Sequence, residues 1–473
     1  MQAAPSGPVI GLLGRLPALL QGRLASIRGQ GARPSFSWNV WVMLAGTFAG
    51  QGISILLSPV LTRIYDPSAF GYLGVYSVLL YTTCVIACLG LDLAIPITAS
   101  DFECANLLAL SAIALVVTTS VIAAITYVLP AHILSPLWLG SIASYRPLLP
   151  IGFFLLGAYY LMLALATRAH AFQDIASTRI AQGLAGPVSQ IALGLLGGGA
   201  PGLAVGFVIG QSSGTIQLFS RTVLRDTTMR AMVSWRGIVA MARRYMHFPL
   251  FASWSKVIEL AGSTGVLFVL FAGLFSGEVA GFMALSDRVI LRPLWMVSTS
   301  VLQVFTGEAG RSISRDPVQL RRRFRQVVSR QFLLASGWIV LTNLLAAWVF
   351  PLAFGEVWGN AVPYLHALSL TYLGLAVLHP VSNMLQMLER QVMAVAWQTA
   401  RLVLVSAAVL LPWQAGCSAV GTLWIFSVVQ GACCATMLAL TAWTIDRQVA
   451  AAASPYPISG SRADRHPASP AAE

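Results

Sequence analysis

Residues 321–353 read RRRFRQVVSRQFLLASGWIVLTNLLAAWVFPLA, an arginine-rich stretch followed by a long apolar run. No charged residue occurs between positions 331 and 353. A hydrocarbon core about 30 Å thick is crossed by a helix of roughly 20 apolar residues. This stretch therefore predicts a membrane-spanning helix with positive charge at one end.

Similar apolar runs occur throughout the chain, which is 57% hydrophobic and only 10% charged. They predict an all-α polytopic membrane protein with about twelve transmembrane helices, because open strands would leave backbone polar groups unpaired in lipid. The period-2 alternation that is typical of an outer-membrane barrel does not occur. The expected spans are residues 38–59, 72–97, 104–129, 148–167, 176–197, 200–220, 247–274, 279–306, 331–353, 360–388, 391–412 and 418–444.

Arginine is concentrated in alternate loops of this arrangement. The heaviest clusters lie between the sixth and seventh spans and between the eighth and ninth. Because positively charged loops stay in the cytoplasm, this asymmetry predicts a bacterial inner-membrane protein with both termini cytoplasmic. The net charge of +13 then reflects topology and contact with the phospholipid bilayer, and no nucleic-acid partner is expected.

The two halves of the chain share a short motif at the same offset. SAFGY at 68–72 and EVAGF at 278–282 each enter the second helix of a half. Internal repeats are common in secondary transporters, although glycine-rich turns also resemble one another by chance. The repeat predicts two six-helix lobes. The expected divisions are a cytoplasmic N-terminal extension at 1–37, an N-lobe at 38–220, a basic cytoplasmic linker at 221–246, a C-lobe at 247–444 and a disordered cytoplasmic tail at 445–473.

Glycines recur every four residues in the sixth span, at Gly202, Gly206, Gly210 and Gly214. This spacing places them on one helix face, where a neighbouring helix can approach closely. We expect packing within a lobe in preference to a dimer interface.

The sequence lacks the motifs of an enzyme. A phosphate-binding loop needs a lysine after a glycine-rich turn, but the single lysine, Lys256, follows Trp254 and Ser255. The six cysteines and six histidines show no metal-ligand spacing. We therefore expect no catalytic residue, no metal and no cofactor.

Ionisable residues occur within the apolar spans, where each costs at least about 2.5–3.5 kcal/mol. They lie in the second, seventh, eighth and eleventh spans: Asp92, Lys256, Glu259, Asp287, Arg288, Arg292 and Arg401. Internal ion pairs would account for some of them. In the last three of these spans, however, four basic residues accompany two acidic ones. A hydrated cationic cavity for an anionic substrate would also explain this surplus.

Several fragments resemble a known family of transporters. In the first half they are LAGTFAGQ at 44–51, SPVLTRIYDP at 58–67, Phe70-Gly71 and LDLAIP at 91–96. In the second half they are Phe248-Pro249 and EVAGFMALSDRVI at 278–290, with Pro293. Together these fragments, which are spread over residues 38–444, resemble the Wzx-type oligosaccharide flippases, the polysaccharide transporter family of the MATE-like MOP superfamily.

The resemblance implies two six-helix lobes around a central cavity. It also implies a flippase that moves undecaprenyl-pyrophosphate-linked oligosaccharide repeat units across the inner membrane by alternating access. Such units serve O-antigen, capsule or exopolysaccharide synthesis, so a polysaccharide polymerase and a chain-length regulator are possible partners. The alternatives are an ion-coupled small-molecule antiporter of the MATE-like branch and a membrane polysaccharide polymerase. A surplus of deep basic residues favours an anionic lipid headgroup over a cationic drug.

The resemblance and the deep charges together nominate the site residues. The substrate-binding candidates are Lys256, Arg288, Arg292 and Arg401, and the ion-coupling candidates are Asp92, Glu259 and Asp287. Only Arg288 receives its role from a matching family motif. The other basic candidates follow from their depth in the membrane.

Overall fold

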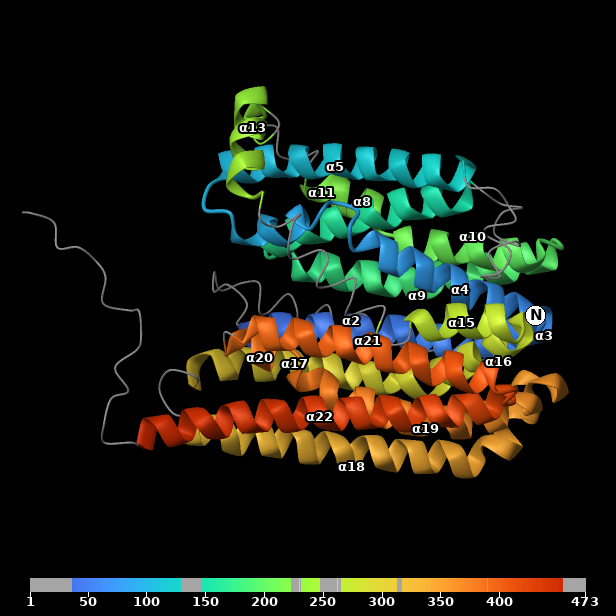
Figure 1. The fold of residues 1–473 in the computed structure, drawn as a ribbon. Helices are drawn as coiled ribbons and strands as arrows, with labels where there is room; N and C mark the ends of the chain where they lie inside the picture. Colours follow the sequence, from blue (N-terminus) through green and yellow to red (C-terminus); the bar gives the residue numbers. More distant parts are fainter. Residues whose placement is uncertain are drawn as a thin grey trace, which may run out of the picture.

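The structure, a computed structural model, describes residues 36–128, 147–222, 229, 231–246, 262, 265–312, 317–388 and 390–453. Long helices run roughly side by side in two groups (Figure 1). One group holds helices of the first half of the chain, and the other holds helices of the second half. The protein therefore has the two lobes that the sequence repeat predicts.

The N-lobe is built from the first half of the chain. It contains α2 (Phe36–Leu56), α3 (Ser58–Ile64), α4 (Pro67–Cys84), the 3-10 helix η1 (Leu91–Ile97), α5 (Asp101–Val128), α8 (Leu148–Arg168), α9 (Phe172–Leu195), α10 (Gly199–Ser212) and α11 (Thr215–Thr222). The basic linker that follows includes a further helix, α13 (Trp235–Arg244).

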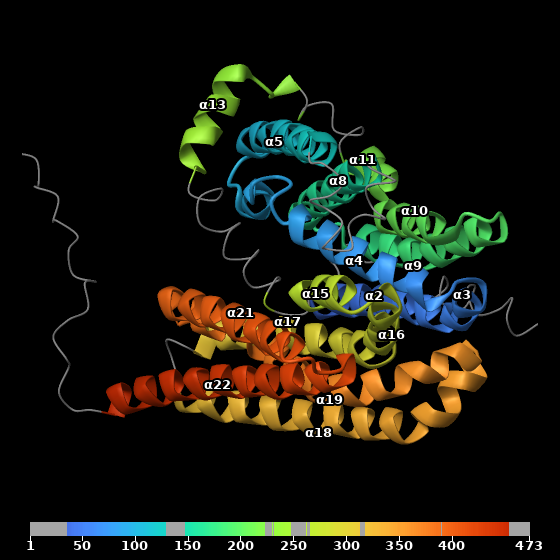
Figure 2. The same cartoon turned by 45° about the vertical axis from the view of Figure 1, so that its right-hand side comes forward.

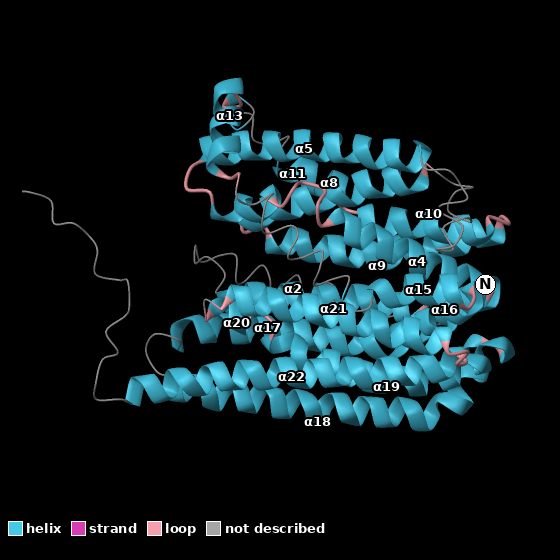
Figure 3. Cartoon of the chain, viewed as in Figure 1, coloured by secondary structure: helices cyan, strands magenta, loops and turns pink. Residues whose placement is uncertain are grey.

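The C-lobe is built from the second half and is seen from another side in Figure 2. It contains α15 (Val266–Leu274), α16 (Gly277–Ser286), the π-helix η5 (Asp287–Leu291), α17 (Arg292–Ser312), α18 (Pro317–Val349), η6 (Phe350–Phe354), η7 (Glu356–Ala361), α19 (Val362–Leu378), η8 (His379–Val381), α20 (Met384–Met387), α21 (Gln391–Gln414) and α22 (Ala419–Ala453). No strand occurs in the described part of either lobe (Figure 3).

Glycines allow the close packing of α10 on α9. A Cβ atom at Gly206 would lie 2.6 Å from Cγ of Gln190, and one at Gly210 would lie 2.6 Å from Cα of Gly186. Neither position has room for a side chain, since packed carbon atoms normally stay about 3.5–4.0 Å apart. The glycine stripe of the sixth span thus packs within the N-lobe.

Eight helical segments in the described residues are long and apolar enough to cross a membrane. They are Val42–Ile64, Asp101–Val128, Leu148–Arg168, Gly277–Thr306, Pro317–Phe354, Glu356–Met387, Val392–Gln414 and Ala419–Ala450. The second, fifth and sixth expected spans correspond to α4, α9 and α10, which are shorter or more polar. Most of the seventh expected span, 247–274, lies outside the described residues.

The second span is interrupted, whereas the sequence predicts one helix over 72–97. The helix α4 ends at Cys84, and the chain resumes as η1 only at Leu91. Between them Leu89 has φ 53° and Gly90 has φ 71°. A right-handed helix cannot continue through such left-handed residues, and the apolar composition of this stretch conceals the break.

The C-terminal end of α22 also differs from the prediction. Disorder is expected from position 445, but the helix continues to Ala453. Ile445 is buried with Leu320 and Phe324 of α18, and Asp446 pairs with Arg321 at 2.9 Å. These contacts stabilise the extra turns, so the prediction of a disordered tail is wrong for residues 445–453.

Candidate functional site

A cavity of about 440 Å³ lies between the two lobes. The N-lobe contributes α2, α4, α9 and α10 to its walls, and the C-lobe contributes α15, α16, η5 and α17. The lining combines arginine and glutamine side chains with hydroxyl groups and aromatic rings. Sites between lobes are common binding sites, because both lobes can contact one ligand.

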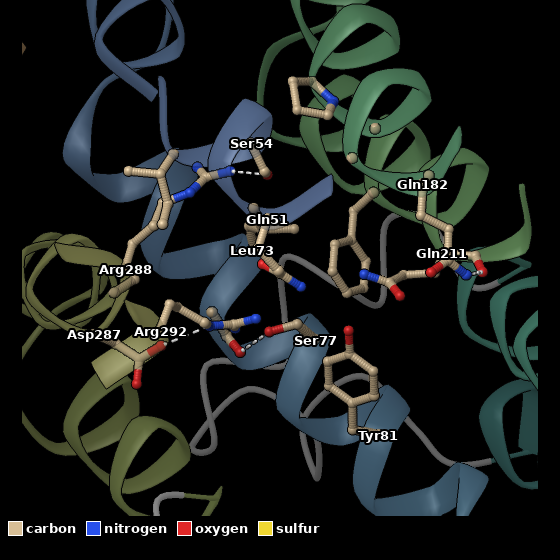
Figure 4. A pocket seen from close by; sticks show the side chains of 18 of the residues that line it. Gln51, Ser54, Leu73, Ser77, Tyr81, Gln182, Gln211, Asp287, Arg288 and Arg292 are labelled. Atoms are coloured by element: carbon tan, nitrogen blue, oxygen red, sulfur yellow. Dashed lines mark hydrogen bonds and ion pairs between the residues drawn. The ribbon is translucent and has the colours of Figure 1, made fainter. Parts of the chain in front are cut away.

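The C-lobe wall of the cavity is cationic. Arg288 on η5 donates from Nη2 to Oγ of Ser54 on α2 at 3.3 Å, and this bond joins the two lobes (Figure 4). Arg292, at the start of α17, pairs through Nε with Oδ2 of Asp287 at 3.2 Å. Asp287 is thus one of the deep charges that an internal ion pair accounts for. π-Helical turns such as η5 are frequent at functional sites.

Amides and aromatic rings form the N-lobe wall around one arginine. Nη1 of Arg179 donates to Oε1 of Gln182 at 3.3 Å, and Nε2 of Gln182 donates to the carbonyl oxygen of Gln211 at 2.8 Å (Figure 4). The rings of Tyr81 and Phe207 meet edge to face, with 5.8 Å between centroids. Amides both donate and accept hydrogen bonds, so this wall suits a ligand rich in hydroxyl groups.

The described lining of the cavity has more positive than negative charge. It contains Arg179, Arg288 and Arg292 but only one carboxylate, that of Asp287. The pair between Asp287 and Arg292 therefore leaves two guanidinium groups without a counter-charge in the lining. This arrangement can attract an anion, because electrostatic interactions are stronger where walls of low dielectric constant exclude water.

Arg179 was not predicted from the sequence. It lies near the start of the expected span 176–197, where an arginine is easily assigned to the basic residues that flank a membrane helix. A signal was present, since Gln182 and Gln190 follow at 3 and 11 positions, close to whole helical turns. Together they form a polar stripe on α9, and all three side chains line the cavity.

Arg401 does not lie in the cavity, contrary to the expectation for a substrate-binding residue. It is only 4% exposed and lies inside the C-lobe between α21 and α22. Nη1 donates to Oε1 of Gln398 at 3.2 Å and Nε donates to Oε1 of Gln430 at 3.4 Å. Arg401 lies near the middle of α21, but its face of this helix packs against α22 and not toward the cavity.

The remaining candidates fall outside the described cavity. Asp92 is at the start of η1 in the N-lobe, close to Cys84 and Cys88, and it is absent from the cavity lining. Lys256 and Glu259 lie outside the described residues. Within the described part of the chain, no group of three histidine, cysteine or acidic residues is placed to hold a metal ion.

The lobes contact each other at the end of the molecule that carries α3. There the indole Nε1 of Trp358 on η7 donates to the carbonyl oxygen of Thr62 at 3.0 Å. The same ring meets Phe70 edge to face, with 5.0 Å between centroids. These contacts join η7 of the C-lobe to α3 and α4 of the N-lobe, so they hold the lobes together on one side of the cavity.

The repeated motifs form a very close contact at this end. A Cβ atom at Gly71 would overlap the carbonyl oxygen of Gly277, and one at Gly281 would overlap that of Pro67. The contact is reciprocal, since Gly71 and Gly281 occupy matching positions in the two motifs. The helices α4 and α16 can therefore touch backbone to backbone about an approximate two-fold axis.

These features define the class of protein. An all-helical membrane protein with two lobes and a cavity between them has the architecture of MATE-type transporters. The structure superimposes on an inward-facing multidrug resistance MATE family transporter of the MOP superfamily with a TM-score of 0.62 and 14% identity, covering 88% of this chain and 100% of that one. The outward-facing conformation of such a transporter gives a TM-score of 0.59 and 15% identity over 87% and 96%.

A further neighbour is a MOP superfamily transporter from Pyrococcus furiosus, described as having a binding pocket of reverse polarity that suggests a different function. It matches with a TM-score of 0.60 and 13% identity over 87% of this chain and 96% of that chain. Residues 60–363 match the family described as polysaccharide biosynthesis protein. The chain belongs to this polysaccharide biosynthesis family. No curated protein matches the sequence significantly.

Proposed function

We propose that this protein is a flippase that carries a pyrophosphate-linked oligosaccharide lipid from the inner to the outer leaflet of a bacterial inner membrane. The observation that supports this most directly is the surplus of arginine in the cavity between the lobes. A pyrophosphate cannot cross hydrocarbon unaided, because it would lose its water without replacement. Guanidinium groups replace that water with charge-assisted hydrogen bonds, often two at a time.

The two walls of the cavity suggest which part of the headgroup each lobe would bind. Arg288 and Arg292 on the C-lobe would bind the pyrophosphate, and Arg179 with Gln182 on the N-lobe would bind the sugars. Trp295 also lines the cavity; one face of its indole is stacked on His379 at 3.9 Å between centroids, so a sugar ring would stack on the other face. The isoprenoid tail would remain in the bilayer while the headgroup passes between the lobes. Membership of a polysaccharide biosynthesis family supports this substrate class.

The position of the basic residues gives the proposed direction of access. The helix α13, whose sequence includes Arg236 and Arg243, lies at the end of the molecule opposite α3 (Figure 1). Basic segments stay in the cytoplasm, so the closed end would face outward and the cavity would accept substrate from the cytoplasmic side. Transport would then require the lobes to separate at Gly71–Gly281 and at Trp358.

Asp287 is the ion-coupling candidate that lies in the cavity, whereas Asp92 lies elsewhere in the N-lobe. An anionic headgroup on Arg292 would compete with the carboxylate of Asp287 for the same guanidinium. The displaced carboxylate could then take up a proton, and so couple substrate binding to a proton gradient. A small-molecule antiporter remains the alternative, and the cationic lining favours the lipid-linked substrate over a cationic drug.

The test is the leaflet distribution of lipid-linked oligosaccharide in cells that lack the gene. Inverted and right-side-out membrane vesicles would be probed with an impermeant lectin. We expect complete repeat units to accumulate on the cytoplasmic side and the intact gene to reverse this. Normal delivery of single units to the outer leaflet would reject the proposal. A block in chain lengthening alone would indicate a polymerase.

A further inference from the structure

We propose that the linker helix α13 is an in-plane anchor that binds anionic phospholipid headgroups of the leaflet at the basic end of the protein. This surface is separate from the cavity, and the proposal does not depend on which substrate is transported. It rests on the orientation of α13, on its attachment to α5 and on the side chains of its free face.

The orientation of α13 is that of an interfacial helix. It stands nearly perpendicular to α5 at one end of the N-lobe in both Figure 1 and Figure 2. Since α5 is long and apolar enough to cross the membrane, a helix perpendicular to it runs along the membrane plane. Amphipathic helices in this position bury an apolar face among headgroups and acyl chains.

One face of α13 is fixed to the N-lobe. Ile238 and Met241 are buried, and the backbone at Gly237 lies against Asn106 of α5 so closely that a Cβ atom would clash with its amide. The Asn106 side chain accepts from the backbone N–H of Ser234 at 2.9 Å. This attachment makes α13 part of the N-lobe, and its opposite face is left for another contact.

An ion pair between Arg244 and Glu103 at the start of α5 strengthens the attachment. The Asn106 amide also donates to the carbonyl oxygen of Met232 at 3.1 Å. The N-terminal side of α13 and its last turn are thus both held on α5. The free face therefore keeps a defined orientation relative to the N-lobe.

The free face combines a large aromatic ring with positive charge. Trp235 is 73% exposed and Met246 is 50% exposed, and Arg236 and Arg243 are exposed beside them. Residues 235, 239 and 243 recur at four-residue spacing, so they share one face of α13. Tryptophan is enriched at the membrane interface, and arginine near the surface attracts anionic lipids.

The neighbouring surface of α5 makes a lipid partner more suitable than a protein one. Val116, Val117 and Val121 of α5 are all more than half exposed, as expected for a helix that faces acyl chains. The helix α13 lies at one end of α5 (Figure 1). Tryptophan and arginine at that level match the boundary between acyl chains and anionic headgroups.

The test is photo-crosslinking of the full chain in nanodiscs of phosphatidylcholine with a minority of phosphatidylglycerol. A benzoylphenylalanine replaces Trp235, and the lipid adducts are identified by mass spectrometry. Because each arginine near an anionic surface contributes about a fivefold preference, phosphatidylglycerol adducts should exceed their bilayer share by about fivefold or more. The matched control carries the probe at Val117, where adducts should follow the bilayer composition.

The double variant Arg236→Gln, Arg243→Gln should reduce the enrichment at position 235 to the bilayer share. Added salt should weaken the enrichment, since salt screens exposed charges. Adducts without a phosphatidylglycerol preference, or adducts with a protein, would overturn the proposal. If the probe at 235 prevents folding, Trp235 is retained and thermal stabilisation by added phosphatidylglycerol is compared between wild type and the double variant. Equal stabilisation of both would also overturn it.

Discussion

The two lobes share a contact but line the cavity differently. At the closed end, α4 and α16 begin in the same way, with Asp66 accepting a hydrogen bond from the N–H of Ala69 and Ser276 accepting one from that of Val279. Along the cavity the C-lobe supplies two of the three arginines and the one carboxylate of the described lining, whereas the N-lobe supplies the third arginine, Arg179, with all the amides and most of the aromatic rings. The two halves are therefore alike at the matched glycines and helix starts of the closed end, and they differ in the residues that face the cavity.

This difference separates a mechanical role from a binding role. The backbone contact at Gly71 and Gly281 joins two similar lobes that we propose move against each other. Both lobes therefore need a glycine at the matching position. An amphiphilic ligand with a charged end and a hydroxyl-rich end needs two different walls. Substitutions at the closed end should thus affect all substrates equally, while those in the cavity should depend on the charge of the substrate.

The largest effect is expected from removing the cationic wall. In the double variant Arg288→Gln, Arg292→Gln, two charge-assisted hydrogen-bond partners are lost, each worth about 1.5–3 kcal/mol. Binding of a pyrophosphate-linked oligosaccharide should weaken by at least roughly 100-fold. Binding can be measured by competition with inorganic pyrophosphate. The control is Arg325→Gln, an exposed arginine of α18 outside the cavity, and equal losses in both variants would contradict a binding role.

A bulky residue at the matched glycines should have the next largest effect. In Gly281→Val the new Cβ would overlap the carbonyl oxygen of Pro67, and overpacking costs about 1–3 kcal/mol. The closed arrangement should become roughly 5- to 150-fold less populated. Spin-label distances between the lobes and transport in proteoliposomes would measure this. In the control, Gly337→Val, the Cβ meets no atom within 4 Å, and wild-type transport by Gly281→Val would argue against a moving contact.

The scaffold could be predicted from the sequence better than the site. Apolar length and arginine placement indicated the helices and the lobes, and the short repeat identified the segments that meet. The cluster at Asp287 and Arg288 was found because charges are costly in lipid. The direction in which Arg401 points was not predictable, because it depends on which face of α21 packs against α22. The break at Leu89 depends on a backbone conformation that the apolar composition does not indicate.

A smaller effect on substrate binding is expected from a substitution in the N-lobe wall of the cavity. Arg179 already donates to Gln182, so part of its hydrogen-bonding capacity is used within the protein and less is available to a substrate. The variant Arg179→Gln should weaken substrate binding by about 3- to 10-fold. The loss should be greater for a repeat unit with an acidic sugar than for a neutral one. Identical losses for both would show that Arg179 positions the amide wall and does not bind the substrate charge.

Removing the carboxylate should change binding in the opposite direction. In Asp287→Asn, Arg292 loses its counter-charge, so the cavity becomes more positive. An anionic headgroup should bind about fivefold more tightly, while the dependence of transport on pH should flatten if Asp287 carries the coupled proton. Asp446→Asn is the control, because that carboxylate pairs with Arg321 outside the cavity. Weaker binding in Asp287→Asn would indicate that the pair is needed to orient Arg292.

The smallest effect on transport is expected from substitution of Arg401. This residue lies in a membrane span but does not line the cavity, so it tests whether depth in the membrane alone indicates a role in binding. Its Nη2 atom is buried without a hydrogen-bond partner in the described structure, so the charge stabilises the C-lobe little. Removing the buried charge relieves its desolvation cost, but it also takes a donor from the amide oxygens of Gln398 and Gln430, at about 1–3 kcal/mol for a buried acceptor left unsatisfied. Because these two effects oppose each other, we expect Arg401→Met to keep transport within about twofold of wild type and to change the melting temperature little. If transport instead falls as far as in Arg292→Gln, with the melting temperature unchanged, Arg401 must reach the substrate in another conformation. The cavity described here would then be only one of the sites that the headgroup occupies.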